Sequence, residues 1–185
     1  MIFNKHYELE GTHAPFSASK SSWLRYDDEK LIETYTNMQA KELGTKLHEF
    51  AKMAIDLGVK QPRNNNTLSA YINDGIGYAM DTEVVLFYSK YFYGTADSIS
   101  FRKNFLRIHD LKTGSIPAHM EQLVVYAALF CLEYKKDPKD IKIELRLYQN
   151  NEVLVHQPEP EEVKDVISKI CHCNSILLKM EEGGA

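Results

Sequence analysis

An aspartate and a lysine two residues apart, Asp110 and Lys112, end a short apolar run just before a Thr-Gly turn. A carboxylate beside an ammonium group can bind a metal and position a water molecule, but structural ion pairs have the same composition. The acid-x-Lys pattern occurs six times in the chain, so the pattern alone does not identify a site. For the other five copies, a solvated surface pair is the better interpretation.

The residues around Asp110 distinguish it from the other copies. Two strand-like runs, rich in Ile, Phe and Tyr, flank a turn at residues 103–104 and predict a hairpin. The register that matches apolar with apolar side chains sets Ile99 opposite Ile108 and Asp97 opposite Asp110. Directly opposed residues share one face of a sheet, with Cβ atoms roughly 4.5–5.5 Å apart. We therefore expect two carboxylates side by side at the end of an apolar face.

Two like charges in such a place are costly unless a cation lies between them. Lys112 is one candidate for this cation. A hard divalent metal is the other, because Mg²⁺ takes oxygen ligands and commonly uses one or two carboxylates plus a substrate phosphate. In the functional interpretation Asp97 and Asp110 bind the metal and Lys112 orients or activates a water. In the alternative interpretation, the aspartates and Lys112 form only an ion pair at a strand end. The spacing of these residues does not decide between the two interpretations.

A helix predicted over residues 38–57 would lie upstream of this hairpin, and Gly58 would end it. Two stripes of side chains run along it. The first is apolar and shows the helical periodicity: Leu43, Leu47, Phe50, Ala54 and Leu57. The second contains a histidine between small residues, which would let the helix approach a sheet closely: Gly44, His48, Ala51 and Ile55.

The remaining pattern alternates between helical and strand periods. Serines at 17, 19, 21 and 22 offer N-cap oxygens, and Pro117 is placed as a first helical residue. The predicted elements are helices at 68–80, 117–135 and 159–180 and strands at 82–90, 92–101, 105–112, 141–149 and 152–156, the last two forming a hairpin. This order predicts an α/β fold, a small mixed sheet flanked by helices. We expect a single domain over 1–185, with N-terminal helices at 19–80, a sheet and catalytic core at 82–156 and a C-terminal helix at 159–180.

Composition narrows the class of protein. The net charge is −4 and no basic tail is present, which disfavours a protein that holds nucleic acid by charge alone but not a metal-dependent enzyme. Three cysteines form no disulfide framework. No apolar run approaches the roughly 18 residues that cross a bilayer, and the N-terminus lacks a signal-peptide pattern, so we expect a cytoplasmic protein without membrane contact.

Several segments, in this order, resemble the RecB-like branch of the PD-(D/E)xK nuclease superfamily. The segments are HAPFSASKSSWL (13–24), ELGTKLHEFA (42–51), YGTADSI (93–99), LRIHDLKTG (106–114) and QLVVYA (122–127). Together they cover about residues 13–130, and they are similar to RecB-type exonucleases encoded by bacteriophages. The resemblance implies a restriction-endonuclease-like core.

The resemblance also implies roles for single residues. His48, Asp97 and Asp110 would be metal ligands, and the backbone carbonyl of Leu111 would complete the metal shell. Lys112 would be the catalytic lysine. For an isolated histidine, a hydrogen-bonded core residue is the commoner outcome. Two neighbouring carboxylates favour the ligand role for His48.

Three further residues complete the set. Gln122 and Tyr126 are four apart on the predicted helix and share one face of it. The resemblance makes them supports of the site or DNA contacts, whereas alone they would be a packing pair. Glu83, on the first strand, is a candidate for an additional acidic residue, although the sequence does not define its register against Asp97.

The implied activity is a Mg²⁺- or Mn²⁺-dependent deoxyribonuclease. It would be an exonuclease in DNA recombination, repair or phage DNA processing, with DNA as substrate and 5′-phosphate ends as product. A phage single-strand annealing partner and a homo-oligomer are further expectations from the resemblance. Some members of this branch carry four cysteines that hold an iron–sulfur cluster, whereas this chain has three and their spacing does not fit, so no cluster is expected. The alternatives are a catalytically silent DNA-binding or assembly module and a structure-specific endonuclease.

Overall fold

A computed structural model describes residues 4–114 and 117–183 of the protein. The chain divides into two compact units, Met1–Thr45 and Lys46–Ala185. The first contains the 3₁₀ helices η1 (Tyr7–Leu9) and η2 (Ala18–Arg25) and the first part of helix α1 (Asp28–Asp56). The expectation of a single nuclease domain over residues 1–185 stays a prediction. All the predicted site residues belong to the second unit.

The serine-rich segment of the first unit does not cap a helix through its side chains. Ser17 precedes η2 but its hydroxyl makes no capping hydrogen bond. The Asp27 carboxylate caps α1 instead, by accepting the Lys30 N–H at 2.8 Å. The expectation of serine caps was therefore wrong, and α1 begins at Asp28, ten residues before the predicted start at residue 38.

The second unit is built on a five-stranded mixed sheet with the order β1-β2-β3-β4-β5. β3 and β4 are parallel, and the other neighbours are antiparallel. The strands are β1 (Asp81–Ser89), β2 (Phe92–Arg102), β3 (Phe105–Leu111), β4 (Lys142–Gln149) and β5 (Glu152–His156). The expected mixed α/β architecture, with a small sheet flanked by helices, is confirmed.

The hairpin between β2 and β3 has the predicted register. Ile99 pairs with Ile108, and the last recorded pair before the carboxylates is Ser98 with His109. The turn residues at 103 and 104 have positive φ angles of 52° and 58°, as a tight two-residue hairpin requires. One further step along this register sets Asp97 beside Asp110.

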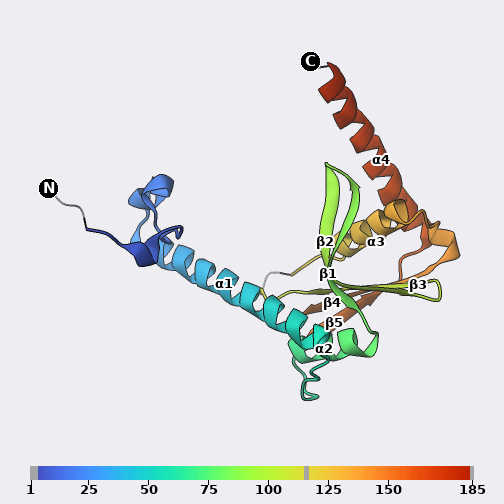
Figure 1. Ribbon diagram of the computed structural model, residues 1–185, viewed down its shortest axis with the longest axis horizontal. Coiled ribbons are helices and arrows are strands. Elements are labelled where there is room, and N and C mark those ends of the chain that lie inside the picture. The colour runs from blue at the N-terminus through green and yellow to red at the C-terminus, as the bar shows by residue number, and fades with distance from the viewer. Residues whose placement is uncertain (1–3, 115–116, 184–185) are drawn as a thin grey trace. The chain divides into compact units, whose positions relative to one another are not determined.

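The helices cover both faces of the sheet (Figure 1). On one face, α3 (Glu121–Glu133) packs over an apolar core, and α4 (Pro160–Gly183) adds Val163 and Ile170 to it. On the other face, α2 (Thr67–Gly77) and the end of α1 enclose a smaller cluster. The short helix η3 (Pro138–Asp140) connects α3 to β4. No helix in the described part of the chain is both long and apolar enough to span a bilayer.

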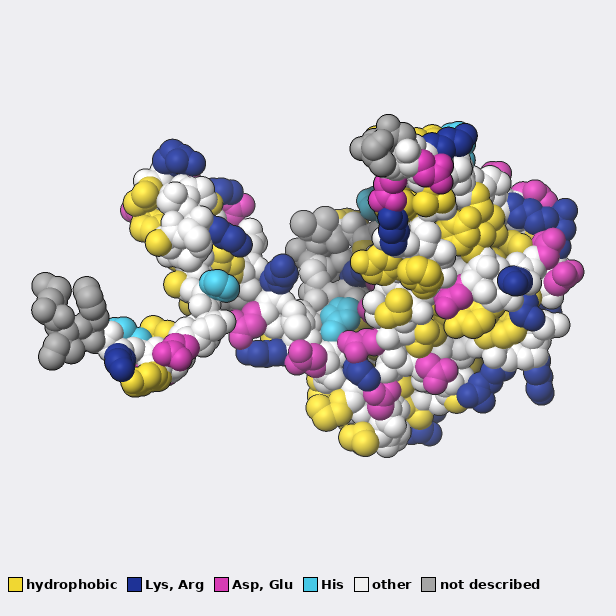
Figure 2. Space-filling view, turned by 45° about the horizontal axis from the view of Figure 1, so that its top comes forward, with side chains coloured by type: hydrophobic (Ala, Val, Ile, Leu, Met, Phe, Trp, Pro, Cys, Tyr) yellow, Lys and Arg dark blue, Asp and Glu magenta, His cyan; other side chains and the backbone are white. Residues whose placement is uncertain are grey.

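The apolar stripe of α1 is mostly exposed. Leu43, Phe50 and Leu57 are 58%, 44% and 70% exposed, whereas Ala51 and Ile55 are 1% and 6% exposed. The helix is packed through its small-residue stripe, because small side chains allow a closer approach than leucines do. Of the first stripe, Ala54 alone is buried. Apolar side chains also remain on the surface of the second unit, between charged ones (Figure 2).

The start of α3 also differs from the prediction. The helix begins at Glu121, so Pro117 is not its first residue. The Gln149 side chain contacts both sides of this region, since its Oε1 accepts the Ala118 N–H at 2.9 Å and its Nε2 donates to the Gly114 carbonyl at 2.7 Å. Residues 117–119 are not helical. The predicted β4–β5 hairpin is confirmed, with positive φ angles in its two-asparagine turn.

A matched pair of glycines in α2 tests the close packing of this helix on α1. A Cβ atom at Gly75 would lie 2.7 Å from Ile55 Cδ1, whereas one at Gly77 would meet nothing within 4 Å. Gly75→Ala should lower the free energy of unfolding by about 1–2 kcal/mol, because overpacking outweighs the gain in helix propensity. Gly77→Ala should be neutral or stabilising in the same urea titration. Adding Ile55→Val to Gly75→Ala should restore stability; equal stabilities of the two glycine variants would contradict this packing.

Candidate functional site

Two carboxylates meet where β2 and β3 leave their shared hydrogen-bonded ladder. Asp110 is 2% exposed, and the Asp97 side chain is 25% exposed. Asp97 Oδ2 accepts the Leu111 N–H at 3.0 Å, so the side chain of one strand bonds to the backbone of the next. This bond holds Asp97 beside Asp110.

Lys112 connects the carboxylates to helix α3. Its Nζ lies 2.9 Å from Asp110 Oδ2 and donates to Asp110 Oδ1 at 3.1 Å. The same ammonium donates to Gln122 Oε1 at 3.0 Å, and Gln122 Nε2 donates to the Tyr126 hydroxyl at 3.0 Å. The structure thus brings the predicted helix pair to the predicted lysine. The three groups form a continuous chain of hydrogen bonds that begins at Asp110.

Sequence reasoning missed the part that Gly94 plays at this place. A Cβ atom at Gly94 would lie 2.9 Å from Tyr126 Cε1. Any larger residue at this position of β2 would therefore force the tyrosine ring or the strand to shift. The glycine belongs to the quoted segment at 93–99, but its role depends on a helix that follows much later in the chain.

His48 reaches the site from α1. Its Nδ1 lies 3.4 Å from Asp97 Oδ2, and its side chain is 35% exposed. The next residues on its stripe, Ala51 and Ile55, are buried against α2 and the sheet. The small-residue face thus brings the imidazole to the carboxylate, as the spacing predicted.

Glu83 lies level with Asp97 on the neighbouring strand. The pairs Thr82 with Ser98 and Val84 with Ala96 enclose it in the register of β1 and β2. Glu83 has a positive φ of 49° and is exposed. In the described part of the chain it makes no hydrogen bond or ion pair with either aspartate. Glu83 therefore lies near the site but does not bond to its aspartates.

The ligand atoms of the site are partly free. Among the residues that the structure describes, no three His, Cys, Asp or Glu side chains form a group that could hold a metal ion. Asp110 Oδ2, however, is buried and accepts no hydrogen bond, although the Lys112 ammonium is near. The ammonium thus pairs with this oxygen by charge, 2.9 Å away, without an aligned hydrogen bond. A carboxylate oxygen of this kind suits a hard cation.

The environment of Asp110 opposes its ionisation. Burial, and then the negative charge of Asp97, raise the pKa of Asp110 to about 6. Lys112 and His48 act in the opposite direction, and they do not overcome the effect of burial. A carboxylate held at this cost is typical of functional sites, where a cation or substrate offsets the charge.

A second polar network lies on the α2 face of the sheet, and sequence reasoning did not find it. The Tyr148 hydroxyl donates to Asp74 Oδ2 at 2.7 Å and lies 3.2 Å from His109 Nδ1. Arg146 Nη1 also donates to Asp74 Oδ2, at 2.8 Å. Burial, with the charges of Arg146 and Arg107, lowers the pKa of His109 to about 3, so this ring is neutral. The signal was the strict alternation of β4, which places Glu144, Arg146 and Tyr148 on one face.

No family model, curated protein or solved structure matches this chain. The nuclease resemblance of the short segments therefore stays a prediction.

The raised pKa of Asp110 predicts a change of stability with pH. The folded protein binds the extra proton between about pH 4 and pH 6, so stability should fall through this window as pH rises. Asp110→Asn removes the penalty. In EDTA, the variant's free energy of unfolding relative to the wild type should rise by on the order of 2 kcal/mol between about pH 4.5 and 7.5.

Asp165→Asn, at an exposed position on α4, is the control and should keep a constant difference from the wild type. Urea titrations at several pH values measure both. A difference for Asp110→Asn that does not change with pH would contradict the assignment.

Proposed function

We propose that this protein is a metal-dependent deoxyribonuclease with a PD-(D/E)xK core of the RecB-like type. The observation that supports it best is the pair of opposed carboxylates, Asp97 and Asp110, with Lys112 bonded to the buried one. A mixed sheet with helices on both faces is compatible with the core that the short-segment resemblance implies. The order of carboxylate, carboxylate and lysine along the hairpin also agrees with that resemblance.

The donor groups present are of the kinds that a divalent cation takes. Asp97, Asp110, His48 and the Leu111 carbonyl would hold it, and the buried Oδ2 of Asp110, which has the Lys112 ammonium 2.9 Å away, would be one of the ligand atoms. When bound, Mg²⁺ or Mn²⁺ supplies Lewis-acid chemistry, which stabilises negative charge on the scissile phosphate and makes water more acidic. Carboxylate and carbonyl oxygens are the ligands that suit these ions.

The protein's own residues then have separate tasks. Lys112 would direct a water toward the phosphate or offset the charge that develops there, since its ammonium has three donors and two already point to fixed acceptors. Gln122 restrains that ammonium, and Tyr126 restrains Gln122. Glu83, exposed and level with Asp97, could take part once substrate is bound. The site is thus organised by hydrogen bonds before DNA arrives.

Exonuclease action, 5′-phosphate products, a cytoplasmic location and a phage recombination partner are part of the proposal through the resemblance alone. One observation favours a second candidate, a silent DNA-binding or assembly module. No group of three metal-binding side chains is preassembled among the residues described. The intact set of Asp97, Asp110 and Lys112 favours the nuclease, because a silent module does not need a costly buried carboxylate.

Digestion of DNA tests the activity. With Mg²⁺ or Mn²⁺ the wild type should degrade linear DNA and spare closed circles, while EDTA should stop the reaction. Asp110→Ala and Lys112→Ala should each lower the rate by at least about a hundredfold, because each removes charge stabilisation of the transition state. Gel assays of end-labelled DNA measure this.

Asp28→Ala is the matched control, since Asp28 and Lys30 repeat the same pattern on an exposed part of α1. It should digest DNA as fast as the wild type. Digestion of closed circles would replace the exonuclease with an endonuclease. An Asp110→Ala protein with full activity would place the site elsewhere.

Binding of Mn²⁺ distinguishes the nuclease from the silent module without any turnover. Calorimetric titration should show carboxylate-dependent binding that weakens at least about tenfold in Asp97→Asn and in Asp110→Asn, because each variant loses a charged ligand. Asp165→Asn should bind as the wild type does. A wild type that binds no Mn²⁺ at these carboxylates would favour the silent module.

A further inference from the structure

A basic pocket lies at the other end of the β2–β3 hairpin from the carboxylates. Its volume is about 660 Å³. The described residues that line it include five basic side chains and one carboxylate, Asp140. This concentration is unusual in a chain with a net charge of −4. It therefore calls for a ligand or a structural explanation.

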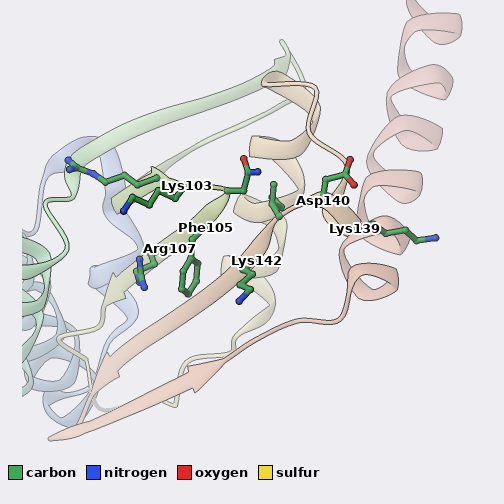
Figure 3. A pocket seen from close by; sticks show the side chains of 9 residues that line it. Lys103, Phe105, Arg107, Lys139, Asp140 and Lys142 are labelled. Carbon is green, nitrogen blue, oxygen red and sulfur yellow. The ribbon is translucent and has the colours of Figure 1, made fainter.

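The sheet register explains how the basic groups come together. Arg102 pairs with Phe105 across the hairpin, and Phe105 pairs with Lys142 on β4. Opposed residues share one face, so Arg102 and Lys142 flank the Phe105 ring, and Arg107 follows two residues along on the same face. Figure 3 shows Phe105, Arg107 and Lys142 projecting to one side of the sheet.

The hairpin turn adds another charge. Lys103 occupies the left-handed turn position, and the neighbouring Asn104 carbonyl accepts the Lys142 N–H at 2.8 Å. This bond ties the turn to the start of β4 and so brings Lys103 and Lys142 to one opening. Lys139, in contrast, points toward α4 (Figure 3), where its Nζ lies 3.3 Å from Glu161 Oε1.

Ion pairs within the protein account for only two of these five charges, Arg107 with Glu144 and Lys139 with Glu161. In the described chain, no carboxylate pairs with Arg102, Lys103 or Lys142. Arg107 is held over the Phe105 ring, 3.7 Å from its centroid, and over Tyr78 at 4.5 Å. Its Nε is buried and donates no hydrogen bond, although Glu144 Oε1 lies 3.4 Å away. Arg107 is thus a guanidinium oriented by two rings, and its terminal Nη groups make no hydrogen bond within the described chain.

We propose that this pocket binds phosphate groups, at least two at once, at a place separate from the carboxylate site. A stacked guanidinium with free donors matches phosphate geometry, and mobile ammonium groups add charge around it. The spread of the cations over a pocket of this size fits an oligophosphate better than a single anion. The phosphates can belong to a nucleic-acid strand or to a free nucleotide.

The pocket is distant from the proposed cleavage site. Phe105 precedes Asp110 by five residues on β3, a separation of about 16 Å at about 3.3 Å per residue. Arg107 and Asp110 also point to opposite faces, because their positions differ by an odd number. A strand held here is therefore not the strand segment that the carboxylates would cut. The inference does not depend on nuclease activity.

Binding in EDTA tests the pocket, because digestion cannot occur there. Fluorescence anisotropy with a labelled single-stranded oligodeoxynucleotide would be measured over a range of salt concentrations. The double variant Lys103→Gln, Lys142→Gln should weaken binding at least tenfold near 50 mM salt. The slope of log K against log salt should fall by about 1.4, or about 0.7 for each lost phosphate contact.

A double variant on α4, Lys169→Gln with Lys179→Gln, removes equal charge from exposed positions and should bind within twofold of the wild type. Competition with tripolyphosphate separates the sources. If tripolyphosphate displaces the oligonucleotide at an equal concentration of phosphate, the pocket binds free oligophosphates. If it does not, the pocket binds a nucleic-acid backbone. Both outcomes support the proposal. Equal weakening by both double variants, no weakening by the pocket variant, or no binding by the wild type would overturn it.

Discussion

The opposition of two carboxylates across the β2–β3 hairpin is the constraint on which the rest of the site depends. Asp97 and Asp110 repel each other, and Asp110 is buried. The Leu111 N–H, the Lys112 ammonium and His48 each offset part of that repulsion. These three partners come from the strand backbone, the strand end and α1. Any element that moved away would leave negative charge uncompensated at the end of an apolar face.

The two faces of the sheet are covered by side chains of different kinds. The α3 face holds the larger of the two apolar clusters of the second unit. The α2 face carries a polar network, in which Tyr148 and Arg146 share the Asp74 carboxylate. Helix α3 belongs both to the apolar core and to the candidate site, because its buried side packs in the core while Gln122 bonds to Lys112. Displacing the core would therefore also disturb the lysine.

The hairpin carries a different charge at each end. Carboxylates are gathered where β3 ends, and basic side chains are gathered where it begins. Because side chains alternate along a strand, the two groups also face opposite sides of the sheet. A phosphate-rich molecule would be repelled by the first group without a metal and attracted by the second. The weakly negative net charge thus conceals a strongly polarised surface.

The sequence by itself determined the local structure around the site. Alternation and apolar matching predicted the strands and the register that opposes Asp97 and Asp110, since both depend on neighbouring residues and on a two-residue turn. Tertiary structure decided which stripe of α1 is buried, because the closeness of approach to α2 outweighs the hydrophobicity of Leu43 or Phe50.

The periodicity of the sequence also did not predict the contacts between residues far apart in the chain. The Gln149 side chain bonds to Gly114 and Ala118, and a Cβ atom at position 94 would lie only 2.9 Å from the ring of Tyr126. The basic pocket combines a hairpin turn with the start of β4, and only their hydrogen bond brings those charges together. The local sequence pattern thus determined which residues share a strand face. Packing between distant segments determined which faces meet, because it depends on contacts between residues that are far apart in the sequence.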